Sequence, residues 1–170
     1  MPDEAEIAPN LQVRLLLPSD AEAMMSWRYP FPYSEYDLDS HDEKVLAELL
    51  HPGNNYHAIL REEELTGFFC FGPDARVPGW SYDDRALDLG MGLRPDLTGQ
   101  GKGHAYLLAV LFYLEQRQLS GKFRATIAAW NSRAIHVCER AGFRAIATFK
   151  RPGVGQKYVV LLREALSGLR

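Results

Sequence analysis

Glycine is concentrated in one short stretch of this chain, between two segments with different hydrophobic patterns. Five of the 14 glycines, at positions 90, 92, 99, 101 and 103, lie within 14 consecutive residues. The preceding segment, Arg85–Leu93, alternates between apolar and small or polar side chains, which is typical of a strand. The following segment, His104–Leu119, is at first apolar on nearly every side, which is typical of a helix buried in a layer. A glycine-rich turn between a strand and a helix favours binding of an anion such as phosphate, because backbone N–H groups converge at the positive end of the helix. A tight turn without a ligand is the alternative interpretation.

The spacing of these glycines excludes two common nucleotide-binding motifs. A Walker A loop needs Gly, four residues and then Gly-Lys-Ser/Thr, but Gly101-Lys102 is followed by Gly103 and preceded, five positions before Gly101, by Asp96. The dinucleotide fingerprint Gly-x-Gly-x-x-Gly, started at Gly99, meets His104 where the third small residue belongs. The anion loop is therefore expected to serve another kind of phosphate ligand.

The other hydrophobic patterns predict a chain in which helices alternate with runs of adjacent strands. Capping-box signals at Ser19 and Ser40 predict the starts of the first two helices. The order favours an α/β (α+β) fold with a mixed, largely antiparallel sheet of about seven strands and helices on both faces. The predicted strands are Leu11–Leu17, Tyr56–Arg61, Leu65–Phe71, Arg85–Leu93, Lys122–Ala129, Phe143–Phe149 and Gln156–Arg163, and the predicted helices are Ala21–Trp27, Val45–Leu50, His104–Leu119 and Asn131–Ala141.

Composition and charge exclude several classes of protein. The 170 residues, 46% of them apolar, suffice for a single domain over residues 1–170, with residues 1–10 as a loose extension. A net charge of −3 excludes a strongly basic nucleic-acid binder and offers no polybasic membrane patch. The longest apolar run, Ala105–Leu114, is too short to span a membrane. Cys70 and Cys138 lie in apolar stretches, as expected of reduced thiols in a cytoplasmic protein, and the histidines show no metal-ligand spacing.

Two segments resemble the GNAT superfamily of acyl-CoA-dependent N-acyltransferases. Asp88–Gly103 is similar to the family's fourth strand and to its pyrophosphate loop, Arg/Gln-x-x-Gly-x-Gly/Ala. Trp130–Phe143 is similar to the family's segment Asn-x-x-Ala-hydrophobic-x-x-Tyr-x-x-x-Gly-Phe. The predicted order of elements agrees with the GNAT fold. The resemblance implies a sheet splayed between strands 4 and 5, and acetyl-CoA as the acyl donor, with no metal.

The resemblance also implies a set of site residues. The expected contacts with the acyl donor are Met91, Leu93, Thr98, Gly99, Gln100, Gly101, Lys102, Gly103, His104, Asn131 and Arg133. The expected contacts with the acceptor are Tyr33, Glu35 and Tyr36, from the aromatic segment Trp27–Tyr36, together with Gly90, while Trp80 and Tyr82 are further candidates whose alternative is an ordinary surface loop. Gly90 and Gly92 are expected to keep one face of their strand open for the pantetheine arm or for the acceptor. Asn131 is equally suited to be a helix N-cap.

Three positions bear on the chemistry. Cys138 stands where the family has the tyrosine that protonates the departing CoA thiolate; a thiol can donate a proton, and the alternatives are water, another tyrosine and a purely structural cysteine. Asp88 is the candidate base for the amine proton, with a carboxylate bonded to solvent or to an arginine as the alternative. The pyrophosphate loop begins with Thr98 where the family usually has Arg or Gln, so one contact of that loop differs.

Together these features predict an acetyl-CoA-dependent N-acetyltransferase. The acetyl group is expected to move to a primary amine of a small molecule or peptide by direct transfer in a ternary complex. Thr126 stands where some relatives that acetylate peptide alanines have a glutamate, which disfavours that activity. The alternative is a non-catalytic sensor module that binds acyl-CoA. The expected partners are acyl-CoA and an amine-bearing acceptor, with no nucleic acid and no membrane, and the chain is expected to be a monomer or a homodimer.

Overall fold

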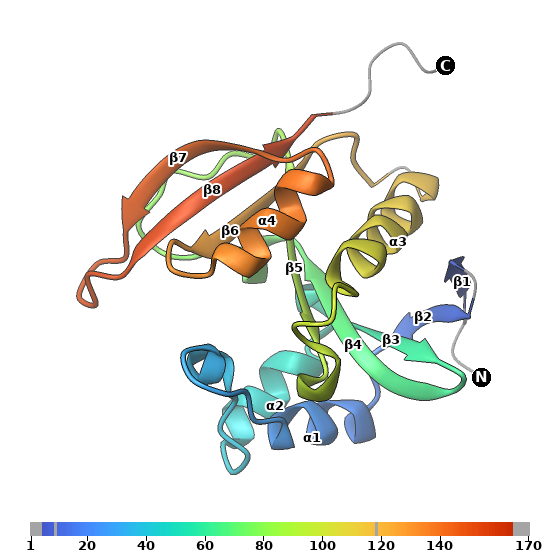
Figure 1. Cartoon of the computed structure of the whole chain (residues 1–170). Helices are drawn as coiled ribbons and strands as arrows, with labels where there is room; N and C mark the ends of the chain where they lie inside the picture. Colours follow the sequence, from blue (N-terminus) through green and yellow to red (C-terminus); the bar gives the residue numbers. More distant parts are fainter. Residues whose placement is uncertain (1–4, 9, 118, 165–170) are drawn as a thin grey trace. The chain divides into compact units, whose positions relative to one another are not determined.

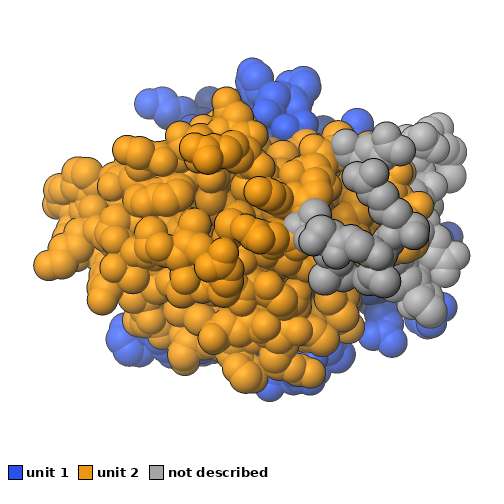
Figure 2. All heavy atoms as spheres, turned by 90° about the horizontal axis from the view of Figure 1, so that it is seen from above, with its two compact units in different colours: residues 1–70, 91–102 blue, residues 71–90, 103–170 orange. Residues whose placement is uncertain are grey.

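The computed structural model of the chain describes residues 5–8, 10–117 and 119–164 (Figure 1). The chain divides into two units, which Figure 2 distinguishes by colour. Unit 1 contains residues 1–70 and 91–102, and unit 2 contains residues 71–90 and 103–170. The strand β5 (Leu87–Leu93) contributes residues to both units, because the boundary falls after Gly90.

Unit 1 is built on an antiparallel series of strands, each hydrogen-bonded to the next. They are β1 (Ala5–Ala8), β2 (Leu11–Leu15), β3 (His57–Arg61) and β4 (Glu64–Phe71), whose last residue belongs to unit 2, followed by the end of β5. The predicted hairpin of β3 and β4 is confirmed. Its turn is Glu62-Glu63, both with positive φ, the combination found in type I′ hairpin turns. The prediction of a loose extension is wrong for residues 5–8, which pair with β2 as β1, whereas residues 1–4 and 9 lie outside the described residues.

Two helices pack together in unit 1, α1 (Pro18–Ser26) and α2 (Glu43–Leu50). Both begin at caps other than the predicted serines. The fixed φ of Pro18 suits a first helical residue, so α1 starts earlier, with the Leu17 N–H donating to the Asp20 carboxylate at 2.8 Å. Asp42 caps α2 by accepting from the Lys44 N–H at 2.8 Å. Ala21, Met24, Met25 and Leu49 form one cluster of buried residues in this unit, and the partly buried Trp27 packs against it.

Unit 2 contains the start of β5 and the remaining α-helices and strands. These are α3 (Gly103–Gln116), β6 (Phe123–Ala128), α4 (Ser132–Arg140), β7 (Arg144–Lys150) and β8 (Lys157–Arg163). The strands lie in the order β5-β6-β8-β7, with β8 antiparallel to both β6 and β7, and the helices α3 and α4 pack together. Gly142, at φ +92°, ends α4 as predicted, and the Phe143 N–H donates to the Cys138 carbonyl at 3.0 Å.

The pairing of β5 with β6 is parallel and short. Leu87 pairs with Phe123 and Asp88 with Arg124, and the ladder ends there. Counted from the strand at Leu11, these are the fourth and fifth strands, so the predicted mixed sheet that opens between them is confirmed. Within the part of the chain that the structure describes, none of the helices combines the length and the hydropathy needed to cross a membrane.

Candidate functional site

The loop Thr98–Lys102 leads directly into α3 and has the backbone geometry of an anion-binding turn. Gly99 and Gly101 have φ of +71° and +76°, a conformation that residues with a side chain rarely adopt. Among the described residues, apart from the two chain neighbours, no atom lies within 4 Å of a Cβ added at Gly101. The first N–H groups of α3 have no acceptor inside the helix, because no earlier turn provides one. Positive φ at two alternating glycines, with a helix that follows directly in the chain, is a pattern shared with phosphate-binding turns.

Two side chains of the loop are turned back onto the backbone before it. The Thr98 hydroxyl donates to the Pro95 carbonyl at 2.7 Å, and the Gln100 amide donates to the Asp96 carbonyl. Pro95 and Asp96 belong to the short 3-10 turn η4 (Pro95–Leu97). These side chains shape the loop, so the groups that it offers to a ligand are chiefly its backbone N–H groups and Lys102.

The remaining glycines of the cluster differ in the side chains that surround them. A Cβ at Gly92 would lie 2.5 Å from the ring of Phe68 on β4, so the missing side chain makes room for that ring. The expectation that Gly92 keeps a strand face open for a ligand is therefore wrong: an aromatic side chain covers it. A Cβ at Gly103 would lie 3.3 Å from Val137 Cγ2, so Gly103 allows α3 to approach α4 closely. Gly90 is partly buried.

Asp88 lies at the last rung of the β5–β6 ladder, and its carboxylate is held by two arginines. Arg124 Nε donates to Oδ1 at 2.7 Å and Arg124 Nη2 donates to Oδ2 at 2.8 Å. Arg76 Nε donates to Oδ2 at 2.8 Å. Asp88 and Arg124 are each only 2% exposed. These contacts favour the alternative stated for Asp88, a carboxylate bonded to arginine, because three charged N–H donors occupy its two oxygens.

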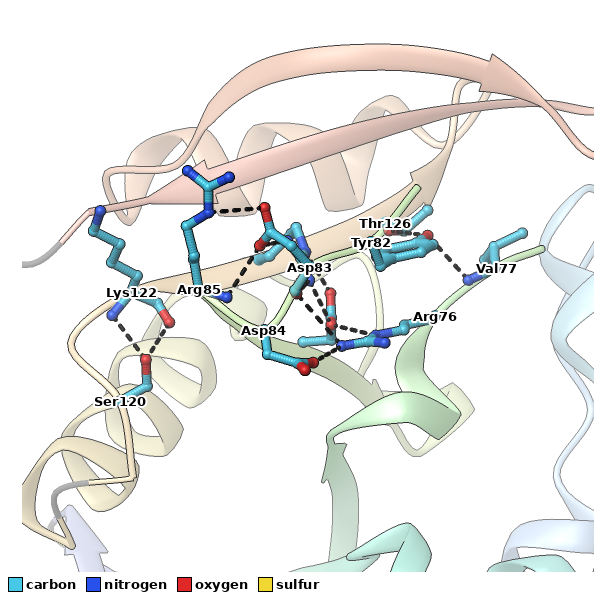
Figure 3. Close-up of polar contacts among 11 residues, drawn as sticks. Arg76, Val77, Tyr82, Asp83, Asp84, Arg85, Ser120, Lys122 and Thr126 are labelled. Carbon is cyan, nitrogen blue, oxygen red and sulfur yellow. Dashed lines mark hydrogen bonds and ion pairs between the residues drawn. The ribbon is translucent and has the colours of Figure 1, made fainter. Parts of the chain in front are cut away.

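The loop between β4 and β5 closes over this ion pair. Figure 3 shows Arg76 beside Asp84, and Tyr82 between Val77 and Thr126. The Tyr82 hydroxyl accepts from the Val77 N–H at 3.0 Å and is hydrogen-bonded to Thr126 Oγ1 at 2.8 Å. The Trp80 and Tyr82 rings meet edge to face at 4.9 Å between centroids. Both rings lie near the Arg124 guanidinium, at 5.4 and 5.1 Å, so these aromatic residues shield the ion pair.

Arg76 and Arg124 were not identified from the sequence. A usable signal existed for Arg124, because a charged residue stands inside a strand of otherwise apolar and small side chains, Phe123–Ala128. Such a residue needs a partner of opposite charge when the strand is central in a sheet. Nothing comparable marks Arg76, which lies in an irregular loop.

The aromatic segment is anchored to the end of β5 through Tyr29. Its hydroxyl donates to the Leu93 carbonyl at 2.6 Å, and its N–H donates to Asp37 Oδ1 at 2.9 Å. Burial, and secondarily the charge of Asp37, raise the pKa of Tyr29 to about 12, so this phenol stays protonated as a donor. The Phe31–Pro32 peptide is cis, and a 3-10 turn, η1 (Tyr33–Tyr36), follows.

The predicted site residues divide between the units. Unit 1 carries Met91, Leu93, Thr98, Gly99, Gln100, Gly101, Lys102, Tyr33, Glu35 and Tyr36; unit 2 carries Asp88, Gly90, Gly103, His104, Asn131, Arg133 and Cys138. Leu93 is buried, whereas Glu35 and Tyr36 are exposed. Asn131 is the N-cap of α4 and accepts from the Ala134 N–H at 3.1 Å, which confirms its structural role. Among the described residues, no group of His, Cys, Asp and Glu side chains is arranged to hold a metal ion.

Cys138 lies on α4 and is buried. Burial, and secondarily the charge of Glu139, raise the pKa of its thiol to about 12. A thiolate leaving group has an ordinary pKa of about 8.5, so this buried thiol is the weaker acid and transfers its proton to such a group unfavourably. The surroundings of Cys138 therefore favour the structural interpretation.

Cys138→Ala is expected to leave the pH dependence of turnover unchanged while altering alkaline stability. The folded pKa lies above the unfolded one, so the thiol's contribution to the free energy of unfolding is complete below pH about 9 and is lost as the pH rises toward about 12. In urea unfolding at pH 8 and pH 10.5, the parent should lose more stability than the alanine variant. Equal losses would contradict the assigned burial of the thiol, and a shifted pH–rate profile would restore Cys138 as proton donor.

Comparison with known proteins gives a family match and many similar structures. The model of the family described as "Acetyltransferase (GNAT) family" matches residues 21–143. No curated protein sequence matches the chain. A GNAT-family acetyltransferase from Bacillus anthracis is similar with a TM-score of 0.73 at 16% identity, over 95% of this chain and 98% of that one.

Two further solved structures contain coenzyme A. AAC(6')-Ib in complex with ribostamycin and coenzyme A has a TM-score of 0.73 at 17% identity, over 91% of this chain and 93% of that one. RimL, a ribosomal L7/L12 alpha-N-protein acetyltransferase in complex with coenzyme A, has a TM-score of 0.69 at 18% identity, over 96% of this chain and 98% of that one. At these identities the likeness establishes a shared fold.

Proposed function

The chain belongs to the GNAT family of acetyltransferases, and from this premise we propose that it transfers the acetyl group of acetyl-CoA to a primary amine of a small molecule or peptide. The observation that carries the proposal is the loop Thr98–Lys102, with positive φ at Gly99 and Gly101 and open space at the Gly101 Cβ position, directly before α3. In the proposal its N–H groups bind the pyrophosphate of CoA, with Lys102 and His104 beside it.

The proposed reaction is direct attack of the amine on the thioester. The neutral amine nitrogen forms a C–N bond to the acetyl carbonyl carbon, the C–S bond breaks, the nitrogen loses a proton, and the CoA thiolate gains one. We assign both proton transfers to water, because three arginine N–H groups occupy the Asp88 carboxylate and burial raises the pKa of Cys138. The rate then depends mainly on positioning of the two substrates.

The acceptor is proposed to be an amine that contacts Tyr33, Glu35, Tyr36 and Gly90. Met91, Leu93 and Arg133 are proposed to contact acetyl-CoA. The similar structures support both sizes of acceptor, since one was solved with ribostamycin and another is described as acting on a ribosomal protein. Glu35 and Tyr36 are exposed and so accessible to such a molecule. We further propose a single domain that is monomeric or homodimeric. A cytoplasmic location is in keeping with the burial of both cysteines, Cys70 and Cys138.

A second candidate function is a sensor that binds acyl-CoA without transferring the acyl group. It is favoured by Cys138, which stands where the family has its proton-donating tyrosine and is a poor acid in its buried position. The two functions share the donor site and differ in turnover.

One experiment separates these functions. Acetyl-CoA binding is measured by isothermal titration calorimetry, and release of the CoA thiol is then followed with a panel of amines, ribostamycin and peptides with free N-termini. Binding with release that depends on an amine is the result expected of the transferase. Binding without release on any acceptor supports the sensor, and no binding of acetyl-CoA contradicts both.

A further inference from the structure

Arg94, which directly follows β5, joins the start of β4 to the turn before the pyrophosphate loop. Its Nη1 donates to Glu64 Oε1 at 2.6 Å and to the Leu65 carbonyl at 3.1 Å. Its Nε and Nη2 donate to the two carboxylate oxygens of Asp96 at 2.6 and 3.0 Å. Its backbone N–H donates to the Thr66 carbonyl at 2.9 Å, so main chain and side chain fix the same junction.

Asp96 connects Arg94 to the loop Thr98–Lys102 through hydrogen bonds. Its carbonyl accepts from the Gln100 side chain, and the Leu97 N–H donates to the Arg94 carbonyl at 2.9 Å. The hydrogen bonds from Arg94 lower the pKa of the Asp96 carboxyl, which keeps it ionised. A continuous set of contacts thus runs from Glu64 through Arg94 and Asp96 to Gln100, between the glycines at 99 and 101.

We propose that Arg94 is a positioning residue that fixes the shape of the loop Thr98–Lys102 before acetyl-CoA binds. The inference rests on the proposed function, because it assigns the loop to the pyrophosphate of that donor. A guanidinium has five N–H donors, and four of those of Arg94 point to acceptors of the protein itself. Arg94 therefore acts through Asp96 and not as a ligand of the phosphate. A loop held in its binding conformation loses less conformational entropy when the ligand arrives.

Removal of either member of the Arg94–Asp96 pair should weaken acetyl-CoA binding. We expect Arg94→Ala to raise the Kd for acetyl-CoA roughly fivefold to tenfold, measured by calorimetry on folded protein. Arg94→Lys should restore little of the lost affinity, because one ammonium group cannot reproduce the planar set of N–H donors that reaches Glu64 and Asp96 at the same time. Once an acceptor has been identified, the Arg94→Ala variant should show a raised KM for acetyl-CoA, with kcat within about twofold of the parental value.

Asp96→Ala best distinguishes the positioning role from a purely electrostatic effect of the charge. The Asp96 side chain is 61% exposed, so its removal does not disturb the buried core. Removal of a negative charge near an anionic ligand should tighten binding by simple electrostatics, whereas the positioning role of Arg94 requires binding to weaken. Arg144→Ala is the matched control, since Arg144 forms an exposed ion pair with Glu164 at 3.6 Å on β7, and its Kd should equal that of the parent.

The possible results are distinguishable. Weaker binding in both Arg94→Ala and Asp96→Ala supports the positioning role. Parental affinity in both variants, or tighter binding in Asp96→Ala, overturns it while the proposed function stands. Failure of the parent protein to bind acetyl-CoA overturns the proposed function, and the role of Arg94 with it.

Discussion

Asp88→Asn is expected to lower the free energy of unfolding by about 3–5 kcal/mol, the usual cost of removing one partner from a buried ion pair. The substitution preserves the size of the side chain but removes the buried carboxylate from the Arg124 guanidinium, which is 2% exposed. The carboxylate that remains to Arg124 is that of the half-exposed Asp83, at 3.2 Å from Nη1. Arg76 loses one of its two carboxylates, since its other ion pair is with Asp84. Urea unfolding followed by circular dichroism measures the change.

Asp84→Asn is the matched control for this prediction. Its side chain is 97% exposed and also pairs with Arg76, at 2.9 Å, so its loss should alter the free energy of unfolding by less than about 1 kcal/mol. If Asp88 were the catalytic base, Asp88→Asn would abolish turnover and remove the acidic limb of the pH–rate profile at nearly parental stability. That pattern would contradict the structural role assigned to the carboxylate.

Gly101→Val is expected to weaken acetyl-CoA binding by about a hundredfold, equivalent to about 2.7 kcal/mol. Two effects add. A β-branched residue is strained at φ +76°, so the loop tends to leave its curved conformation, and the new side chain occupies space that the proposed pyrophosphate needs. Calorimetric titration with acetyl-CoA measures the loss, and circular dichroism checks the fold.

Gly153→Val is the matched control for a valine at positive φ outside the loop Thr98–Lys102. Gly153 lies in the turn between β7 and β8 at φ +79°, and a Cβ there also meets nothing within 4 Å. The two variants therefore carry a similar backbone penalty, but only Gly101→Val should lose affinity for acetyl-CoA. Equal affinity of both variants and the parent would remove the loop from the donor site.

Much of the fold follows from periodic patterns in the sequence. The hairpin of β3 and β4, the apolar α3 and the helix between Asn131 and Gly142 were all predictable, because each depends on residues near one another in the chain. The starts of α1 and α2 were not, since several polar residues compete to cap each helix. Pro18 and Asp42 prevailed over the predicted serines through a fixed φ and a carboxylate acceptor respectively.

The candidate site was predictable where it depends on backbone geometry. The positive φ values of Gly99 and Gly101 agree with the glycine spacing. Contacts between residues far apart in the chain could not be predicted from the sequence. Arg124 reaches Asp88 across 36 positions, and Phe68 covers Gly92 from another strand, so neither partner could be identified from a local pattern.

Three of the five clustered glycines differ in the compensating change that a larger residue at their position would require. Position 92 is coupled to the ring at Phe68, and position 103 to the branched side chain of Val137, so a smaller neighbour could compensate for a Cβ at either place. Position 101 has no such neighbour among the residues that the structure describes. A side chain at position 92 or 103 therefore requires a compensating change at Phe68 or Val137, whereas a side chain at position 101 is limited by the backbone conformation there and by whatever the loop binds.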